Sequence, residues 1–176
     1  MLSPGQELPE FRLEVGIRNN PSRTLETVSA SSFSGRWRLY LFLDRSPEMV
    51  WAVELAYFVS LRPQFEHRNL KVLGVMMDGA FVQHYLRECR EKAIDRPLPM
   101  LTDSEGALAR AVGVQTSQRA SFLVDPSNKV RYACGYDAAV PRNAFEILRI
   151  LDTLNPPVSP AVFPDKEIEA FGSKPS

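Results

Sequence analysis

Residues 37–58 read "WRLYLFLDRSPEMVWAVELAYF", an apolar run, a short polar stretch and a second apolar run. The first run, 37–44, is apolar enough to form a central strand that is buried on both faces of a parallel sheet. Pro47 suits the first turn of a helix that follows. In such sheets, functional side chains gather where the strands end. However, the residues from Glu48 to Trp51 include no obvious nucleophile.

The composition is that of a globular protein with one sizeable core. The 176 residues are 44% hydrophobic and 24% charged, and 21 Lys and Arg residues balance 21 Asp and Glu residues. A zero net charge argues against a general attraction to nucleic acid or to anionic membranes. No segment approaches the roughly 20 apolar residues of a membrane span, and the first residues do not resemble a secretory signal. We therefore expect a cytoplasmic protein.

The cysteines and histidines do not indicate a metal or cofactor site. Cys89 and Cys134 form no CxxC pair, and we expect both to be reduced thiols in a cytosol. His67 and His84 have no convergent set of ligands around them, so surface positions are expected for both. The sequence implies no metal and no cofactor.

The remaining pattern predicts alternating strands and helices. Strands are expected at 11–15, 37–44, 70–78 and 99–103, and helices at 47–67, 79–94 and 104–112. A hairpin at 120–137 and a helix at 141–154 follow. Pro63 should kink or split the first helix, Gly113 should stop the third, and the Ser-rich stretch 28–35 reads as a connection.

This order of elements predicts an α/β fold. It consists of a mixed central β-sheet with helices on both faces. Residues 1–155 form one domain in this interpretation. Residues 156–176 are rich in proline and form a C-terminal arm or tail, which wraps a neighbouring subunit or offers a polyproline ligand.

Several stretches, taken in their order along the chain, resemble the peroxiredoxins, in particular the AhpC/TSA branch that uses two cysteines per cycle. They are "PGQELPEF" at 4–11, "SSFSGRWRLYLF" at 31–42, "VLGVMMD" at 72–78, "PMLTD" at 99–103, "RASFLVDPSNKVRY" at 119–132 and "PRNAFEILRIL" at 141–151. The similarity covers about residues 4–163. It implies the thioredoxin-like fold of that family.

The resemblance also shows what this chain lacks. The family's catalytic loop reads Pro-x-x-x-Thr-x-x-Cys, closely followed by Glu-Leu or Glu-Ile. Aligning that pair with Glu54-Leu55 places Asp44 at the proline, Glu48 at the threonine and Trp51 at the reactive cysteine. The resolving cysteine of the C-terminal arm corresponds to Ser159. The resemblance therefore implies a variant without either working cysteine.

Other parts of the family's pocket are retained. Arg119 matches the arginine that steadies the thiolate and the peroxide, Arg142 matches a second arginine, and Glu54 matches the glutamate that orients both. A buried arginine without a counter-ion is costly. We therefore hypothesise that Glu48, or as second choice Asp44, pairs with Arg119 or Arg142 and seals the pocket.

The leading interpretation is a peroxiredoxin-like protein that acts as a non-catalytic binding, scaffold or regulatory module. Trp51 then either fills the pocket and core or meets a protein partner of unknown identity. The resemblance implies a homodimer through the edge strand at 130–137, and a larger ring is compatible with it.

Two alternatives stay open. Cys134 or Cys89 could serve as a relocated thiol nucleophile for a peroxide or disulfide. The retained arginine and glutamate pocket could instead bind or convert another small molecule. The default reading of both cysteines is inert packing or a small apolar edge residue.

Overall fold

The computed structural model describes residues 1–16, 26–44, 50–92, 94, 96–115 and 118–156, without the side chains of residues 50–53 and 90. The chain forms two compact units, Met1–Ala144 and Phe145–Ser176. The first contains the whole sheet. In the second, α5 (Ala144–Leu154) joins Glu146 to Arg149, one turn apart, by two hydrogen bonds of 2.8 Å.

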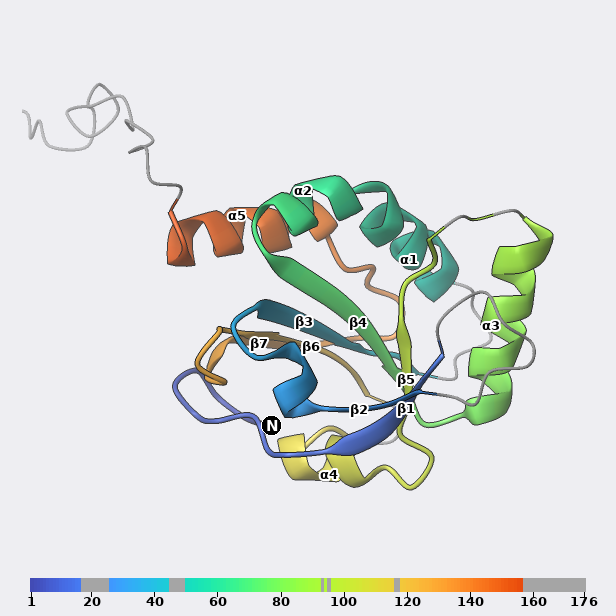
Figure 1. The fold of residues 1–176 in the computed structure, drawn as a ribbon, viewed down its shortest axis with the longest axis horizontal. Coiled ribbons are helices and arrows are strands. Elements are labelled where there is room, and N and C mark those ends of the chain that lie inside the picture. Colours follow the sequence, from blue (N-terminus) through green and yellow to red (C-terminus); the bar gives the residue numbers. More distant parts are fainter. Residues whose placement is uncertain (17–25, 45–49, 93, 95, 116–117, 157–176) are drawn as a thin grey trace, which may run out of the picture. The chain divides into compact units, whose positions relative to one another are not determined.

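The first unit is built on one mixed sheet of seven strands in the order β2-β1-β5-β4-β3-β6-β7 (Figure 1). The strands are β1 (Arg12–Gly16), β2 (Glu26–Ser29), β3 (Trp37–Phe42), β4 (Leu70–Met76), β5 (Met100–Thr102), β6 (Arg119–Val124) and β7 (Val130–Tyr136). β4 runs parallel to both β3 and β5, and the other pairs are antiparallel. The predicted mixed sheet is confirmed, with β3 in its interior between β4 and β6, and with β7 at its edge.

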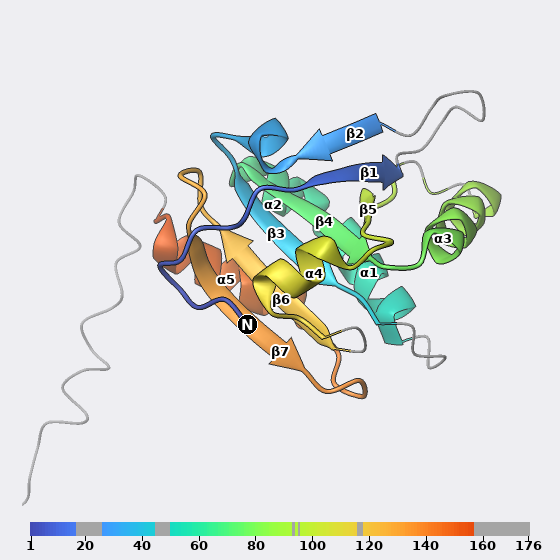
Figure 2. The same ribbon diagram turned by 90° about the horizontal axis from the view of Figure 1, so that it is seen from below.

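Helices cover both faces of this sheet, as expected from the sequence. They are α1 (Val50–Ser60), α2 (Arg62–His67), α3 (Gly79–Glu91) and α4 (Ala107–Val112), with a short 3-10 helix η1 (Ala30–Phe33). Figures 1 and 2 show α1 and α2 on one face and α4 on the other. None of the helices within the described ranges has the length and apolar character of a membrane span.

The core follows from the two-residue period of the strands. On the α4 face, Tyr40, Leu73 and Phe122 are fully buried, and they pack with Phe11 and Val112. On the other face, β3 and β4 present buried Leu and Val side chains to α1 and α2, where Phe58 and Phe65 stack at 5.9 Å between ring centroids. The sheet therefore has no solvated face at β3, which explains its continuous apolar sequence.

Pro63 and Gly113 interrupt the helices as the sequence predicts. The first helix is divided at Leu61, the N-cap residue of α2, and Pro63 lies in the first turn of α2. Gly113 ends α4 in the left-handed region at φ 73°. The part of the predicted helix at 47–49 lies outside the described residues.

The prediction that residues 28–35 form a simple connection is wrong in part. Val28 and Ser29 end strand β2, which pairs with β1, and η1 follows directly. β2 lies at the open edge of the sheet and is exposed or half-buried along its length. An edge strand with a polar sequence carries no clear apolar alternation.

Candidate functional site

Glu54 is a carboxylate on the buried face of α1. Phe58 follows it at the helical spacing of four residues and is also buried, so the two share the face turned toward the core. The Glu54 side chain is 2% exposed. A buried carboxylate is stable in such a place only when it has charged or hydrogen-bonding partners.

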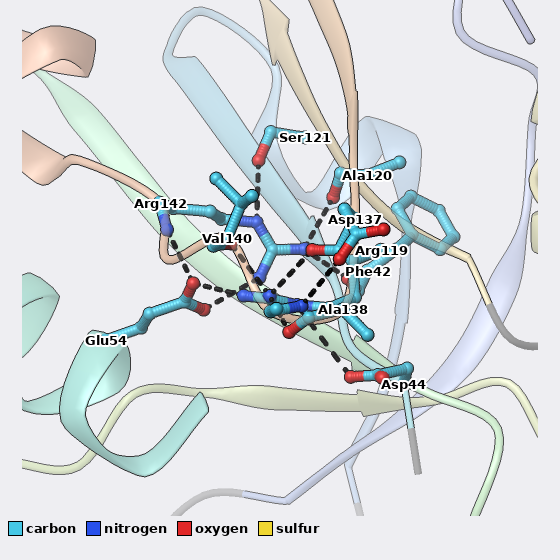
Figure 3. A network of polar contacts seen from close by, with 11 residues as sticks. Phe42, Asp44, Glu54, Arg119, Ala120, Ser121, Asp137, Ala138, Val140 and Arg142 are labelled. Atoms are coloured by element: carbon cyan, nitrogen blue, oxygen red, sulfur yellow. Dashed lines mark hydrogen bonds and ion pairs between the residues drawn. The ribbon is translucent and has the colours of Figure 1, made fainter. Parts of the chain in front are cut away.

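The first partner of Glu54 is Arg119, the first residue of β6. Its Nη2 donates to Glu54 Oε1, and its Nη1 faces three backbone carbonyls of the segment that follows β7 (Figure 3). These acceptors are the oxygens of Asp137 at 3.3 Å, Ala138 at 2.9 Å and Val140 at 2.9 Å. The guanidinium group therefore ties β6 to α1 and to the chain beyond β7.

The second partner is Arg142. Its Nη1 donates to Glu54 Oε2 at 3.0 Å, and its backbone N–H donates to Glu54 Oε1. Its Nε donates to the hydroxyl of Ser121 at 3.0 Å, and its Nη2 donates to the carbonyls of Phe42 and Ala120. Arg142 is thus held by α1, β3 and β6 at once.

An aromatic ring completes the surroundings of Arg142. The guanidinium carbon lies 5.1 Å from the centre of the Tyr136 ring, within the range of a cation–π interaction. Burial lowers the pKa of Arg142, and the Arg119 charge acts in the same direction, whereas Glu54 raises it. An arginine in such a network stays charged at neutral pH.

Asp44 adds a second carboxylate, just after the end of β3. Its Oδ1 lies 3.7 Å from Nε of Arg119, and the two side chains are 6% and 1% exposed. We call Asp44, Glu54, Arg119 and Arg142 the polar cluster. The cluster contains two positive and two negative groups, and it contains no thiol.

The structure thus brings together Glu54, Arg119 and Arg142, the three residues that the resemblance groups in one pocket. Of the two carboxylates considered as partners for Arg119, Asp44 reaches it and Glu48 lies outside the described residues. Trp51 is the second residue of α1, but its indole lies outside the described side chains. Ser159 lies outside the described residues as well.

Sequence reasoning did not single out Ser121 or Tyr136, which both contact Arg142. Ser121 is 0% exposed in the strand "RASFLV", which is apolar apart from Ser121 and Arg119. A polar residue in the middle of a buried strand is a signal that it has an internal partner. The carbonyls that accept from Arg119 leave no such trace, because any residue type supplies them.

The two thiols occupy different settings. Cys89 on α3 is 3% exposed, and burial raises the pKa of its thiol. Cys134 on β7 is half-buried and is the register partner of Ser121 on β6. Cys134 therefore lies one strand away from the polar cluster, whereas Cys89 belongs to the core. The described residues include no group of three or more His, Cys, Asp and Glu side chains arranged to bind a metal ion.

A separate groove of about 540 Å³ opens where β4 and β5 end. Its lining includes Met76, Met77, Asp78, Glu105 and Arg110. Glu54, Arg119 and Arg142 are not among the residues that line it. This groove therefore does not provide the ligand pocket beside Arg119 that a small-molecule function would need.

Comparison with known proteins identifies relatives along most of the chain. Residues 4–133 match the model of the AhpC/TSA family. The chain is 32% identical over 166 residues to alkyl hydroperoxide reductase C of Mycolicibacterium smegmatis, covering 88% of this chain and 85% of that protein. It is 27% identical to a 1-Cys peroxiredoxin of Dirofilaria immitis, covering 85% of this chain and 72% of that one.

A solved structure agrees with these relatives. Mycobacterium tuberculosis AhpC matches with a TM-score of 0.79 and 28% sequence identity, covering 92% of this chain and 97% of that chain. The same arrangement of strands and helices therefore extends over nearly the whole of both proteins.

Proposed function

Because this chain belongs to the AhpC/TSA family of peroxiredoxins, we propose that it keeps the fold of the family without its thiol chemistry and serves as a non-catalytic binding or scaffold protein. The observation that carries the proposal is the identity of residue 51. α1 begins at Val50, and its next residue is tryptophan where the resemblance places the reactive cysteine.

The chemistry of peroxide reduction explains why this substitution matters. A thiolate attacks one peroxide oxygen and becomes a sulfenic acid while the other oxygen leaves. An indole has no ionisable nucleophile that could take this role. Losing the nucleophile removes most of the activity of such a site, because nucleophile and surroundings act as a unit. The serine at residue 159 fits the same loss, since a resolving thiol has no purpose without a sulfenic acid.

The polar cluster supports a structural role for the retained arginines. Their donors are directed at Glu54, at Asp44 and at backbone carbonyls, and both side chains are at most 5% exposed. In this proposal the former pocket locks α1 to the sheet and no longer receives a substrate. Only a small part of each guanidinium group remains accessible to a molecule in solution.

A peroxide assay on the full-length, reduced protein tests the proposal. We expect hydrogen peroxide and an organic hydroperoxide to disappear no faster than with free cysteine, and sulfenic acid to form slowly. Rapid, stoichiometric thiol loss that Cys134→Ser abolishes and Cys89→Ser leaves unchanged would establish the rival reading, a relocated nucleophile on β7. Peroxide consumption by the Cys89→Ser/Cys134→Ser variant would refute both readings.

The self-association surface in this proposal is the outer edge of β7 from Arg131 onward, because Val130 at the start of the strand already bonds to Gly5 and Gln6. A strand at the edge of a sheet has unpaired backbone groups that can pair with a second copy. We expect a homodimer in light scattering, and slower amide exchange across residues 131–136 at high protein concentration than at low concentration. A monomeric mass with concentration-independent exchange would contradict this edge pairing. A larger ring would appear in the same light-scattering experiment.

A scaffold needs a partner, and the proposal places it in the cytoplasm because Cys89 and Cys134 are both free thiols. Co-purification from the native host followed by mass spectrometry tests for it. A protein recovered in constant proportion to the chain would support the proposal. Recovery of the chain alone would remove the main reason to call it a scaffold.

A further inference from the structure

Within the described residues, Asp44 supplies the negative charge that balances the polar cluster. Glu54 contacts both Arg119 and Arg142, whereas Asp44 contacts only Arg119. Without Asp44, two buried guanidinium groups would share one carboxylate among the residues that the structure describes. A buried charge without compensation costs on the order of several kcal/mol, so this position requires an anion.

The contact between Asp44 and Arg119 is a loose one. The separation of 3.7 Å between Oδ1 and Nε is longer than a hydrogen bond, and Arg119 Nε is a buried donor without a hydrogen-bond partner. The other donors of Arg119 face Glu54 and the carbonyls of residues 137–140. Nε is therefore the donor that remains for an anion, and it faces the carboxylate of Asp44 (Figure 3).

We propose that Arg119 Nε is the donor of a small-anion site and that the carboxylate of Asp44 is its built-in occupant. The occupant is chemically a monocarboxylate, so the site should accept formate, which has the same charged group, once the Asp44 side chain is removed. In the native chain Asp44 excludes such anions from Arg119. The inference rests on the charges and contacts of the cluster, and it is independent of whether the protein reduces peroxides.

Truncation and rescue test this site. Asp44→Ala should be less stable than the native chain, and sodium formate should restore part of the loss with a saturable dependence on concentration. At ten times the dissociation constant, the expected rise in Tm is about 3–6 °C. Sodium benzoate at equal ionic strength, whose ring is too large for the vacated space, should give no saturable rise.

Three matched proteins separate a specific site from a general salt effect. The native chain already contains its anion and should not respond to formate. Asp44→Asn keeps the shape but not the charge, so it should be destabilised and still unresponsive because the amide fills the space. Asp125→Ala removes a carboxylate that pairs with the partly exposed Arg131, and it should respond no more than the native chain.

A direct readout comes from the amide-type N–H signal of Arg119 Nε in a ¹⁵N spectrum, assigned by its absence in Arg119→Lys. We expect formate to move this signal in Asp44→Ala and not in the native chain. An unmoved signal, together with a Tm that rises equally in formate and benzoate, would overturn the proposal. If Asp44→Ala does not fold in dilute buffer, the refolded fraction in formate against benzoate replaces the Tm, and equal fractions would again overturn it.

Discussion

Glu54 on α1 binds Arg142, 88 residues further along the chain, through Oε2 and Nη1 at 3.0 Å, and both side chains are at most 2% exposed. The same carboxylate accepts from Arg119, so a single acidic residue contacts two buried arginines, and Asp44 supplies the second negative charge beside Arg119. A salt bridge on the surface contributes little to stability. Removing one partner of this buried pair is costly, because the other partner stays buried without its counter-charge.

We predict that Glu54→Gln lowers the free energy of unfolding by about 3–5 kcal/mol, because it leaves two buried guanidinium groups with Asp44 alone. Urea-induced unfolding followed by circular dichroism measures the change. Glu66→Gln is the matched control, since Glu66 pairs with Arg96 at 2.8 Å but the two side chains are 45% and 64% exposed. Its expected loss is about 0–1 kcal/mol. Equal losses in the two variants would contradict a special role for Glu54.

The two thiols should react at very different rates with an alkylating reagent. Cys89 is buried in the core and its pKa is raised by burial, so both access and thiolate formation are unfavourable. Cys134 is half-buried on an edge strand. We expect iodoacetamide to label Cys134 first and Cys89 only through opening of α3, as read by peptide mass spectrometry. The Cys89→Ser variant, which keeps only Cys134, should be alkylated in a single fast phase. The Cys134→Ser variant, which keeps only Cys89, should be alkylated in a single slow phase.

Restoring the cysteine alone should not restore peroxide chemistry. In a background without Cys89 and Cys134, Trp51→Cys restores a thiol at the position that the resemblance to the family groups with Asp44 and Glu48 in one loop, and like charges there would oppose thiolate formation. Adding Asp44→Pro and Glu48→Thr removes both charges. If one carboxylate raises the thiol pKa by a single unit, the triple variant should form sulfenic acid about tenfold faster at neutral pH. Trapping with dimedone measures the rate, and a single variant as fast as the triple one would contradict the argument.

Asp125 predicts a pH-dependent contribution to stability. Burial favours a higher pKa for Asp125, but hydrogen bonds to Oδ1 from Lys129 and Ser127 and the contact with Arg131 outweigh it, so the pKa of Asp125 is lowered from its ordinary value. A depressed pKa stabilises the fold above the unfolded value, and this stability is lost as the pH falls through the folded value. Asp125→Asn should therefore cost about 1–2 kcal/mol at pH 7, and less as the pH drops below about 4.

Urea titrations at pH 7 and at acid pH check this prediction. Glu14→Gln removes an exposed carboxylate on β1 and serves as the control, with a small effect at both pH values. If Asp125→Asn lowered the free energy of unfolding by the same amount down to acid pH, the shape of the side chain and not its charge would be responsible for the stabilisation.

The sequence predicted the central strands well because burial on both faces leaves a strong mark. Strand β3, expected at 37–44, spans 37–42, and the strand expected at 70–78 spans 70–76. The split of the first helix followed from Pro63, whose ring is compatible with a first helical turn but not with a helix interior. These features depend on local chemistry, which a single sequence contains.

The features that the sequence missed depend on distant contacts. β2 owes its existence to pairing with β1, and its own four residues are too polar to indicate a strand. The resemblance suggested Arg119 and Arg142, yet it could not show that Arg119 Nε lacks a hydrogen bond and faces Asp44. Whether a buried donor has a partner is decided by the folded geometry of several segments.

The long separation between Glu54 and its arginines also affects how the nascent chain matures. Arg119 and Arg142 follow Glu54 by 65 and 88 residues, so helix α1 leaves the ribosome well before either partner. At translation rates of about 5–20 residues per second, Arg142 is added roughly 4–18 s after Glu54. Arg119 is added after roughly 3–13 s, and until then the carboxylate lies on an apolar helix surface with neither arginine available. The full set of ion pairs that fixes α1 to the sheet therefore forms only after the ribosome has passed residue 142.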